Sequence, residues 1–244
     1  MHPIVCQIGL LSIYSFGVML ALAVFVCSFL LAKDAGRHGL QKNVVYDLVF
    51  WVMLAGILGA RTFYVLLNLN FFIENPQEII MIQRGGLAWQ GGLIAGAVAA
   101  WIFIRKHRLS VPAIFDLAAP YLALGHAIGR VGCFLNGCCH GRHWDKGIYF
   151  PVHQDTLYPT QLYESFLLLA IFFILKLYAK KSRPLGQVFI VYLCLASLER
   201  FVVEFFRGDH FQTWLGFSIF QWNSAIIFIT ALVANYYLSR RRRN

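Results

Sequence analysis

The stretch LSIYSFGVMLALAVFVCSFLLA, residues 11–32, contains no charged side chain. An α-helix rises about 1.5 Å per residue, so a segment of this length reaches across the roughly 30 Å of hydrocarbon in a bilayer. No basic region precedes the segment and no small-residue cleavage site follows it. We therefore expect an uncleaved membrane-spanning helix here and not a signal peptide.

Six further apolar runs of similar length follow along the chain. They lie at 44–69, 86–104, 112–135, 160–178, 186–206 and 221–238. The composition agrees with a membrane protein, because 59% of the residues are hydrophobic, only 13% are charged and the mean hydropathy is +0.64. The sequence predicts an all-α polytopic membrane protein of about seven spans that forms a single domain, residues 1–244. The glycines crowded into run 86–104 are typical of close helix packing.

The net charge of +10 reflects membrane topology. Lys and Arg stand in short clusters between the apolar runs, whereas a nucleic-acid-binding protein gathers them on a soluble face, so we expect no nucleic-acid partner. One set of loops carries fourteen basic residues, including Arg240–Arg243, and the other set carries only Arg84, Arg142, Lys146 and Arg207. The positive-inside rule then predicts an amino terminus outside the cell and a carboxyl terminus in the cytoplasm.

Polar side chains inside the spans are expected at one depth. A charge at the bilayer centre costs about 2.5–3.5 kcal/mol on insertion scales, so such groups are usually paired or functional. Arg61 lies roughly 25 Å along its helix from the predicted cytoplasmic end. The other spans also place polar residues towards the outer side: Tyr14, Gln90, Arg130, Asn136, Gln161, Tyr163, Glu164, Arg200, Glu204 and Arg207. These positions predict one site near the outer headgroups.

Two triplets at i, i+4 and i+7 each share a helix face: His126, Arg130 and Cys133, and Arg200, Glu204 and Arg207. Arg200 and Glu204 can form an ion pair, and one isolated pair of this kind only neutralises two buried charges and sets helix register. Three arginines lie within the spans, however, and one glutamate cannot neutralise them all. Surplus positive charge at headgroup depth suits a lipid phosphate, so the sequence predicts a bound or reacting phospholipid.

Six segments, in order over nearly the whole chain, carry a family resemblance. They are YSFGVML at 14–20, LGARTFYVL at 58–66, RGGLAWQGGLIAG at 84–96, GRVGCFLNGCCHG at 129–141, YPTQLYE at 158–164 and RFVVEFFRGDH at 200–210. Together they resemble the prolipoprotein diacylglyceryl transferases, a family of bacterial inner-membrane enzymes.

The resemblance implies a seven-span, multi-pass enzyme of the inner membrane that acts at its outer leaflet in the first step of lipoprotein maturation. It transfers the diacylglyceryl group of phosphatidylglycerol to the lipobox cysteine of a preprolipoprotein and leaves glycerol phosphate. The implied partners are therefore phosphatidylglycerol, the lipobox peptide and membrane lipids, and no cofactor is implied.

The resemblance also suggests roles for single residues. Arg130 corresponds to an arginine that would hold the lipid phosphate and stabilise the charge that develops as the carbon–oxygen bond breaks. Arg200 and Glu204 match the family's arginine and glutamate in the R-x-x-x-E segment. The remaining substrate-binding candidates are Tyr14, Arg61, Asn136, Gly141 and Glu164, together with Arg207 from its shared helix face.

Three positions depart from the family pattern. Gln90, a catalytic position in the resemblance, stands where many members have a histidine, and an amide cannot act as a base. Cys133 and Cys138 stand where many members have asparagine and glutamate. A thiol nucleophile must lose its proton, so the identity of the base is open. The candidates are His126, His140 and His143, with Glu204 as another, and a subgroup that depends chiefly on phosphate binding would also fit.

Three clustered cysteines raise a second kind of chemistry. Cys133, Cys138 and Cys139, with His140 and His143 nearby, are ligand types that suit zinc. Their spacing fits no zinc-finger pattern and adjacent cysteines seldom bind one ion, so we predict no metal. The alternatives are a disulfide, between Cys138 and Cys139 or between Cys133 and Cys138, and free thiols.

Two other functions fit parts of the sequence. Charges and glycines within spans also mark transporters, but transporter sites tend to lie at the midplane between repeated halves, and we find no repeat. A catalytically inactive paralogue that binds lipid or lipoprotein is consistent with the lost histidine and glutamate. Detection of a thioether product separates the enzyme from both.

Overall fold

The structure is a computed structural model that describes residues 1–8, 11–37, 40–82, 85–208 and 212–241. The chain forms two compact units, one made of Met1–Leu31 with Phe115–Asn244 and the other of Ala32–Ile114. The single domain expected from the sequence stays a prediction. Some residues used above lie outside the described ranges: Arg84, Asp209, His210, Arg242 and Arg243.

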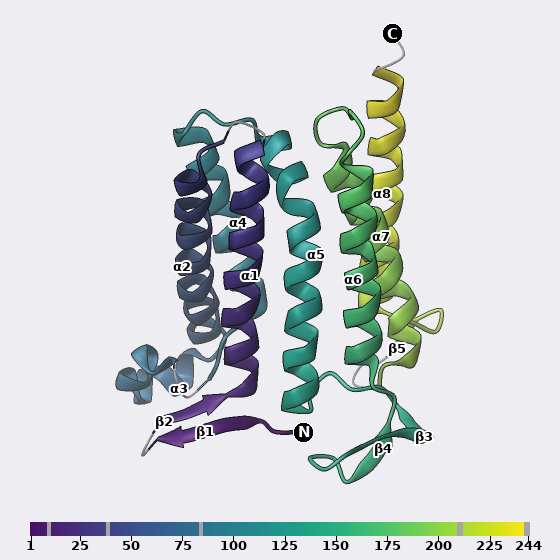
Figure 1. The fold of residues 1–244 in the computed structure, drawn as a ribbon. Coiled ribbons are helices and arrows are strands. Elements are labelled where there is room, and N and C mark those ends of the chain that lie inside the picture. The colour runs from purple at the N-terminus through teal and green to yellow at the C-terminus, as the bar shows by residue number, and fades with distance from the viewer. Residues whose placement is uncertain (9–10, 38–39, 83–84, 209–211, 242–244) are drawn as a thin grey trace. The chain divides into compact units, whose positions relative to one another are not determined.

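Long helices build most of the first unit (Figure 1). They are α1 (Ser15–Arg37), α5 (Val111–Asn136), α6 (Thr160–Tyr178), α7 (Gln187–Val203) and α8 (Ile219–Arg241), and α1 and α5 each extend a few residues into the second unit. Helix α7 packs against both α6 and α8. A short 3₁₀ turn, η3 (Glu204–Phe206), follows α7 directly.

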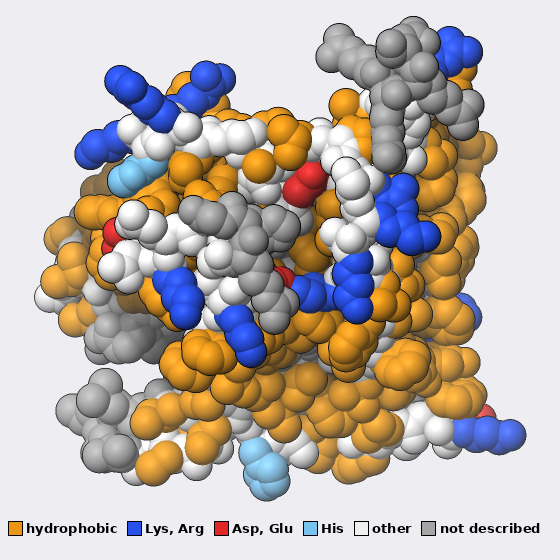
Figure 2. Space-filling model, turned by 45° about the horizontal axis from the view of Figure 1, so that its top comes forward, with side chains coloured by type: hydrophobic (Ala, Val, Ile, Leu, Met, Phe, Trp, Pro, Cys, Tyr) orange, Lys and Arg blue, Asp and Glu red, His pale blue; other side chains and the backbone are white. Residues whose placement is uncertain are grey.

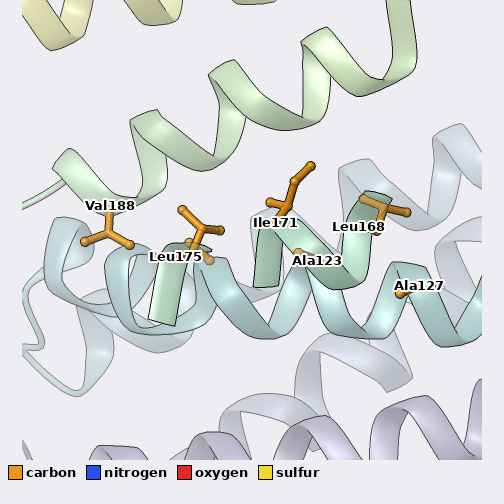
Figure 3. Close-up of a cluster of buried hydrophobic side chains, with 7 residues drawn as sticks. Ala123, Ala127, Leu168, Ile171, Leu175 and Val188 are labelled. Carbon is orange, nitrogen blue, oxygen red and sulfur yellow. The ribbon is translucent and has the colours of Figure 1, made fainter. Parts of the chain in front are cut away.

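Alanines of α5 pack against branched side chains of α6 in the core of this unit. The buried core alternates alanines of α5 with branched residues of α6, each at helical spacing, and α7 adds a valine. Figure 3 shows this cluster, which consists of Ala119, Ala123, Ala127, Leu168, Ile171, Leu175 and Val188. The packing holds α5 and α6 side by side, so that residues near the end of α5 and the start of α6 meet.

Asp116 of α5 fixes the start of α7. Its carboxylate accepts hydrogen bonds from the backbone N–H groups of Gly186 (2.6 Å) and Phe189 (2.8 Å). These N–H groups have no partner within the helix, and a carboxylate at a helix N-terminus also interacts favourably with the helix dipole. Asp116 therefore ties α7 to α5 at the opposite end of α5 from Arg130.

The described residues of this unit also form three short antiparallel hairpins. The strand pairs are β1 (Ile4–Ile8) with β2 (Leu11–Tyr14), β3 (His143–Phe150) with β4 (Asp155–Leu157), and β5 (Gln212–Trp214) with β6 (Phe217–Ser218). The first hairpin precedes α1, and the second occupies the long connection between α5 and α6. The third leads into α8.

The second unit is a helix pair joined by a short helical segment. Helices α2 (Lys42–Leu67) and α4 (Trp89–Lys106) pack together, and α3 (Leu69–Glu74) and the 3₁₀ helix η1 (Pro76–Ile80) lie between them in sequence. A Cβ at Gly59 would lie 2.3 Å from Ala95 Cβ, and one at Gly91 would lie 2.4 Å from Gly59 O. Only glycines permit this crossing, so the close packing expected from the glycines of run 86–104 is confirmed.

Among the described residues, five helices are long and apolar enough to cross a membrane: Ser15–Gly36, Lys42–Leu67, Val111–Asn136, Thr160–Tyr178 and Ile219–Arg240. These helices agree with the expected polytopic membrane protein and the described residues are mainly helical, but the short β-hairpins depart from the expected all-α class, and the total of seven spans stays a prediction. The remaining two expected spans coincide with helices α4 and α7, which have 18 and 17 residues. These two helices are not among those long and apolar enough to cross a membrane by length and composition.

Some predicted boundaries are wrong by a few residues, for local reasons. Run 11–32 starts too early, because Leu11–Tyr14 pairs with β1 and α1 begins at Ser15. Run 86–104 also starts too early, since Gly86 has a φ of +79° that an α-helix does not accommodate, and α4 begins at Trp89. Run 186–206 ends in the 3₁₀ turn η3.

The outward faces of the helices are apolar. Figure 2 shows hydrophobic side chains over most of the visible surface, with Lys and Arg in separate groups. Large exposed side chains include Phe25 of α1 and Phe166 of α6, which are 69% and 72% exposed. Exposed apolar area of this extent matches a lipid environment and not water.

Candidate active site

An ion-pair cluster forms where α5 ends, α6 begins and α7 ends. Glu164, near the start of α6, lies at its centre with a side chain only 1% exposed. Its carboxylate pairs with the guanidinium of Arg130 from α5, with Arg200 of α7 (3.0 Å) and with Arg207 after η3 (3.4 Å). One carboxylate thus joins three arginines that come from different elements.

Glu204 is the second carboxylate of the ion-pair cluster. It is fully buried and pairs with Arg200 Nη2 (2.6 Å) and, more distantly, with Arg207 Nε (3.8 Å). The predicted ion pair between Arg200 and Glu204 is confirmed. The Ser218 hydroxyl, from β6, donates a hydrogen bond of 2.7 Å to Glu204 Oε1. Ser218 was not among the residues predicted from the sequence, because a serine just before a helix gives no sign of a distant carboxylate partner.

The ion-pair cluster, defined as Arg130, Glu164, Arg200, Glu204 and Arg207, carries three positive and two negative charges. The charges of these five residues therefore sum to one positive charge; the buried Glu199 of α7 also lies within electrostatic reach of all three arginines. Arg200 and Arg130 keep 21% and 14% of their side chains exposed, whereas both carboxylates are buried. The accessible part of the cluster is thus cationic, which suits a phosphate or another anion.

The surplus positive charge comes from different residues than the sequence predicted. From the sequence, Arg61 was expected to be the third arginine and Glu204 the only counter-charge. Arg61 belongs to the other unit, while Arg207 supplies the third guanidinium and Glu164 supplies a second carboxylate. The expectation that one glutamate faces the arginines is therefore wrong, although a surplus of positive charge remains.

A backbone clamp places Arg207 beside the ion-pair cluster. Gly141 N donates to Tyr158 O (2.9 Å), and Arg142 N donates to Phe206 O (3.0 Å). Gly141 and Arg207 form an isolated antiparallel bridge. A Cβ at Gly141 would lie 2.4 Å from Tyr158 Cβ, so no larger residue fits there. Gly141 acts here by letting three backbone segments meet, which positions the guanidinium of Arg207.

Residues 3–237 match the sequence model of a family described as prolipoprotein diacylglyceryl transferase. The chain belongs to this family. Relatives named phosphatidylglycerol–prolipoprotein diacylglyceryl transferase include one from Geobacter sulfurreducens, which is 33% identical over 98% of this chain and 96% of its own length. One from Clostridium tetani is 32% identical over 86% of each chain. One from Enterococcus faecalis is 32% identical over 95% of this chain and 87% of its own.

Two further candidate residues of this prolipoprotein diacylglyceryl transferase family member, Tyr14 and Asn136, lie outside the ion pairs. Tyr14, at the end of β2, pairs with Ile4 and is 49% exposed, apart from the ion pairs. Asn136 is the last residue of α5, two residues before Cys138. Both belong to the same unit as the ion-pair cluster but make none of its ion pairs.

Two family positions, Arg61 and Gln90, lie in the second unit. The buried guanidinium of Arg61 donates to the carbonyl groups of Ile79 (2.9 Å), Gly85 (2.7 Å) and Gly86 (2.9 Å), and also to that of Glu78. Arg61 thereby holds the loop that precedes α4. Gln90 is exposed in the first turn of α4. Their roles towards substrate stay predictions.

The three candidate histidines have different surroundings. His126 is exposed on α5, four residues before Arg130 and within electrostatic reach of Arg130 and Arg200. His140 Nδ1 lies 2.9 Å from Gly141 O. His143, in β3, lies between two carboxylates, with Nδ1 2.7 Å from Asp155 and Nε2 3.0 Å from Asp145. His126 is thus the candidate closest to the arginines along the chain.

Hydrogen bonds to Asp155, and secondarily to Asp145, raise the pKa of His143 above its usual value, while the same contact lowers the pKa of Asp155. A histidine whose charged form is favoured in this way is a weaker candidate for a base, since less of it is neutral at physiological pH. The contact stabilises the β3–β4 hairpin between the two pKa values. The stabilisation is lost when the pH rises above the pKa of His143, because the imidazole becomes neutral. It is also lost when the pH falls below the pKa of Asp155, because the carboxylate is protonated.

We expect Asp155→Asn to lower the pKa of His143, because the partner that most favours the imidazolium is removed. The measurement is a ¹H–¹⁵N NMR titration of the imidazole in detergent micelles. Asp145→Asn is the matched control and should lower the pKa by less, since its hydrogen bond is the longer of the two. An unchanged His143 titration in Asp155→Asn would contradict the contact.

Proposed function

We propose that this chain is a transferase that moves the diacylglyceryl group of phosphatidylglycerol to the lipobox cysteine of preprolipoproteins. The observation that carries the proposal is the surplus of guanidinium groups in the ion-pair cluster, where buried carboxylates orient arginines whose exposed parts suit a phosphate. The names of the relatives support both substrates. Nothing in the described residues specifically favours the transporter or the inactive paralogue.

The reaction forms one bond and breaks one. The lipobox sulfur attacks the glycerol carbon of the diacylglyceryl group that carries the phosphate ester, and a carbon–sulfur bond forms as the carbon–oxygen bond breaks. The bonding electrons leave with the phosphate oxygen, so glycerol phosphate departs and the thiol proton is released. Negative charge on the phosphate grows during this step, and cations placed beside it stabilise the transition state more than the ground state.

Within this reaction, we assign Arg130 and Arg200 to the phosphate and Glu164, Glu204 and Arg207 to holding them in place. Arg130 and Arg200 are the more exposed arginines of the ion-pair cluster, while each carboxylate receives at least two guanidinium groups. His126 is our candidate for the base, since both ring nitrogens of His143 are occupied and the carboxylates are engaged.

We further propose that the seven long helices of the described residues all cross the membrane, with the amino terminus outside and the carboxyl terminus in the cytoplasm. The distribution of Lys and Arg among the loops supports this orientation. The ion-pair cluster then lies towards the outer leaflet of the bacterial inner membrane, because α5 and α7 run outward and α6 begins there. That side is where a lipobox cysteine becomes accessible after export.

One assay tests both the reaction and its side. Right-side-out and inverted membrane vesicles with labelled phosphatidylglycerol in both leaflets receive a lipobox peptide too polar to cross the bilayer. We expect thioether product in right-side-out vesicles and little in inverted ones. Product in neither preparation from folded protein would reject the enzyme, and product only in inverted vesicles would reject the orientation.

A further inference from the structure

Three cysteine thiols converge beside the ion-pair cluster. The Sγ atoms of Cys133, Cys138 and Cys139 all lie within 4.8 Å of one another, and all three are free and partly buried. Cys133 is in the last turn of α5, and the other two follow the helix end. The proposed transfer reaction uses none of these thiols.

The backbone explains how two adjacent cysteines can face the same point. Neighbouring side chains in extended backbone point to opposite sides, which is why adjacent cysteines seldom bind one ion. Cys139, however, has a φ of +60°, in the left-handed region, and Gly137 has a φ of +76°. This turn interrupts the alternation. The Cys138 N–H also donates to Cys133 O (3.1 Å), which folds the turn back on the helix.

Two fully buried side chains of α6 hold the turn. Thr160 Oγ1 donates to Cys139 O (3.0 Å), and Gln161 Nε2 donates to Cys138 O (2.7 Å). A left-handed non-glycine residue costs on the order of 1 kcal/mol or more and persists when its surroundings fix it. These hydrogen bonds fix the turn that carries Cys138 and Cys139, so the three thiols are held in place before a ligand binds, as a preorganised site requires.

The donor set and its spacing suit a thiophilic metal ion. Zinc–sulfur bonds are about 2.3 Å long, so sulfurs in a tetrahedral site lie about 3.8 Å apart. The observed separations need to contract by no more than roughly 1 Å. Three thiolates and one Zn²⁺ carry a net charge of −1, and Arg130 and Arg207 lie within electrostatic reach of Cys139 to balance it.

We propose that Cys133, Cys138 and Cys139 bind one thiophilic metal ion, such as Zn²⁺, through their three sulfur atoms, with water at the remaining position. The ion joins the end of α5 to the turn that leads to Gly141, and it supports the segment on which the backbone clamp of Arg207 depends. This site goes beyond the transfer reaction and does not rest on it.

Cobalt provides the test, because thiolate ligands give Co²⁺ a charge-transfer absorption that histidine and carboxylate ligands do not. Reduced, full-length protein without an affinity tag of histidines is titrated with Co²⁺ in detergent. We expect the absorption to saturate at one equivalent. Cys139→Ser should weaken binding at least about tenfold, whereas Cys194→Ser, a free cysteine on α7, should not.

Alkylation keeps the proposal testable if a variant folds poorly. In the unaltered protein, Zn²⁺ should protect Cys133, Cys138 and Cys139 from a thiol reagent, as read by mass spectrometry, and leave the exposed Cys6 reactive. Absence of both protection and the charge-transfer absorption in folded, reduced protein would overturn the metal site. The metal site would also be overturned if protein isolated without reductant contained a disulfide among the three thiols and bound no metal after reduction.

Discussion

Arg130→Ala is expected to slow diacylglyceryl transfer by about 100- to 1,000-fold, the usual effect of removing one group that stabilises developing charge in a transition state. The protein should still fold, because Glu164 retains Arg200 and Arg207 as partners when Arg130 is lost. The initial rate with phosphatidylglycerol and a lipobox peptide gives the activity. Thermal unfolding in detergent gives the stability.

The division between kcat and KM separates two roles for Arg130. A loss mainly in kcat means that Arg130 acts on the charge of the transition state, whereas a loss only in KM means that it binds the lipid uniformly. Arg105→Ala is a matched control, since Arg105 lies at the end of α4 over the ring of Trp101 and outside the ion-pair cluster. Normal turnover by folded Arg130→Ala would remove the assignment.

Glu164→Gln should give the largest loss of stability among single changes in the ion-pair cluster. The amide keeps the shape of the side chain but removes the negative charge shared by three arginines. Breaking a buried ion pair by removing one partner typically costs about 3–5 kcal/mol. We expect a lower Tm in neutral detergent and little transfer activity. Glu74→Gln, an exposed change in α3, is the control and should leave the Tm unchanged.

The same variant also tests whether the ion-pair cluster receives a phosphate. In Glu164→Gln the surplus rises from one positive charge to two, so an added lipid phosphate should replace part of the lost counter-charge. Phosphatidylglycerol should then raise the Tm of Glu164→Gln by more than it raises that of the unaltered protein, and phosphatidylcholine should not. A Tm equal to that of the Glu74→Gln control would show that Glu164 has no such role.

The helices were the most predictable part of this protein. An unpaired backbone amide is costly in hydrocarbon, so apolar runs of sufficient length must become helices. Run 112–135 agrees with α5 to within one residue at each end, and run 160–178 agrees with α6 completely. Several errors arose where a local feature replaced the helix, such as the strand Leu11–Tyr14 before α1 and the positive φ of Gly86 before α4.

The candidate site was predictable only in part. The spacing of Arg200 and Glu204 gave their ion pair, since residues four apart on one helix are neighbours by geometry. Glu164 was predicted at the same level as the arginines, but its three partners come from α5, α7 and the turn after η3, which the sequence did not indicate. No spacing in the sequence encodes contacts between helices.

The sequence by itself determined the membrane fold, the orientation we propose and the supply of arginines, because each follows from local hydrophobicity, charge counts and helix period. Only the tertiary structure decided which charges meet. It assigned Arg61 to carbonyl groups, gave Glu164 three guanidinium partners, and turned Cys139 so that adjacent thiols face one point. The physical reason is that these contacts depend on how the helices pack and where turns reverse the chain. The spacing of residues along the sequence does not determine the distances between residues of different helices.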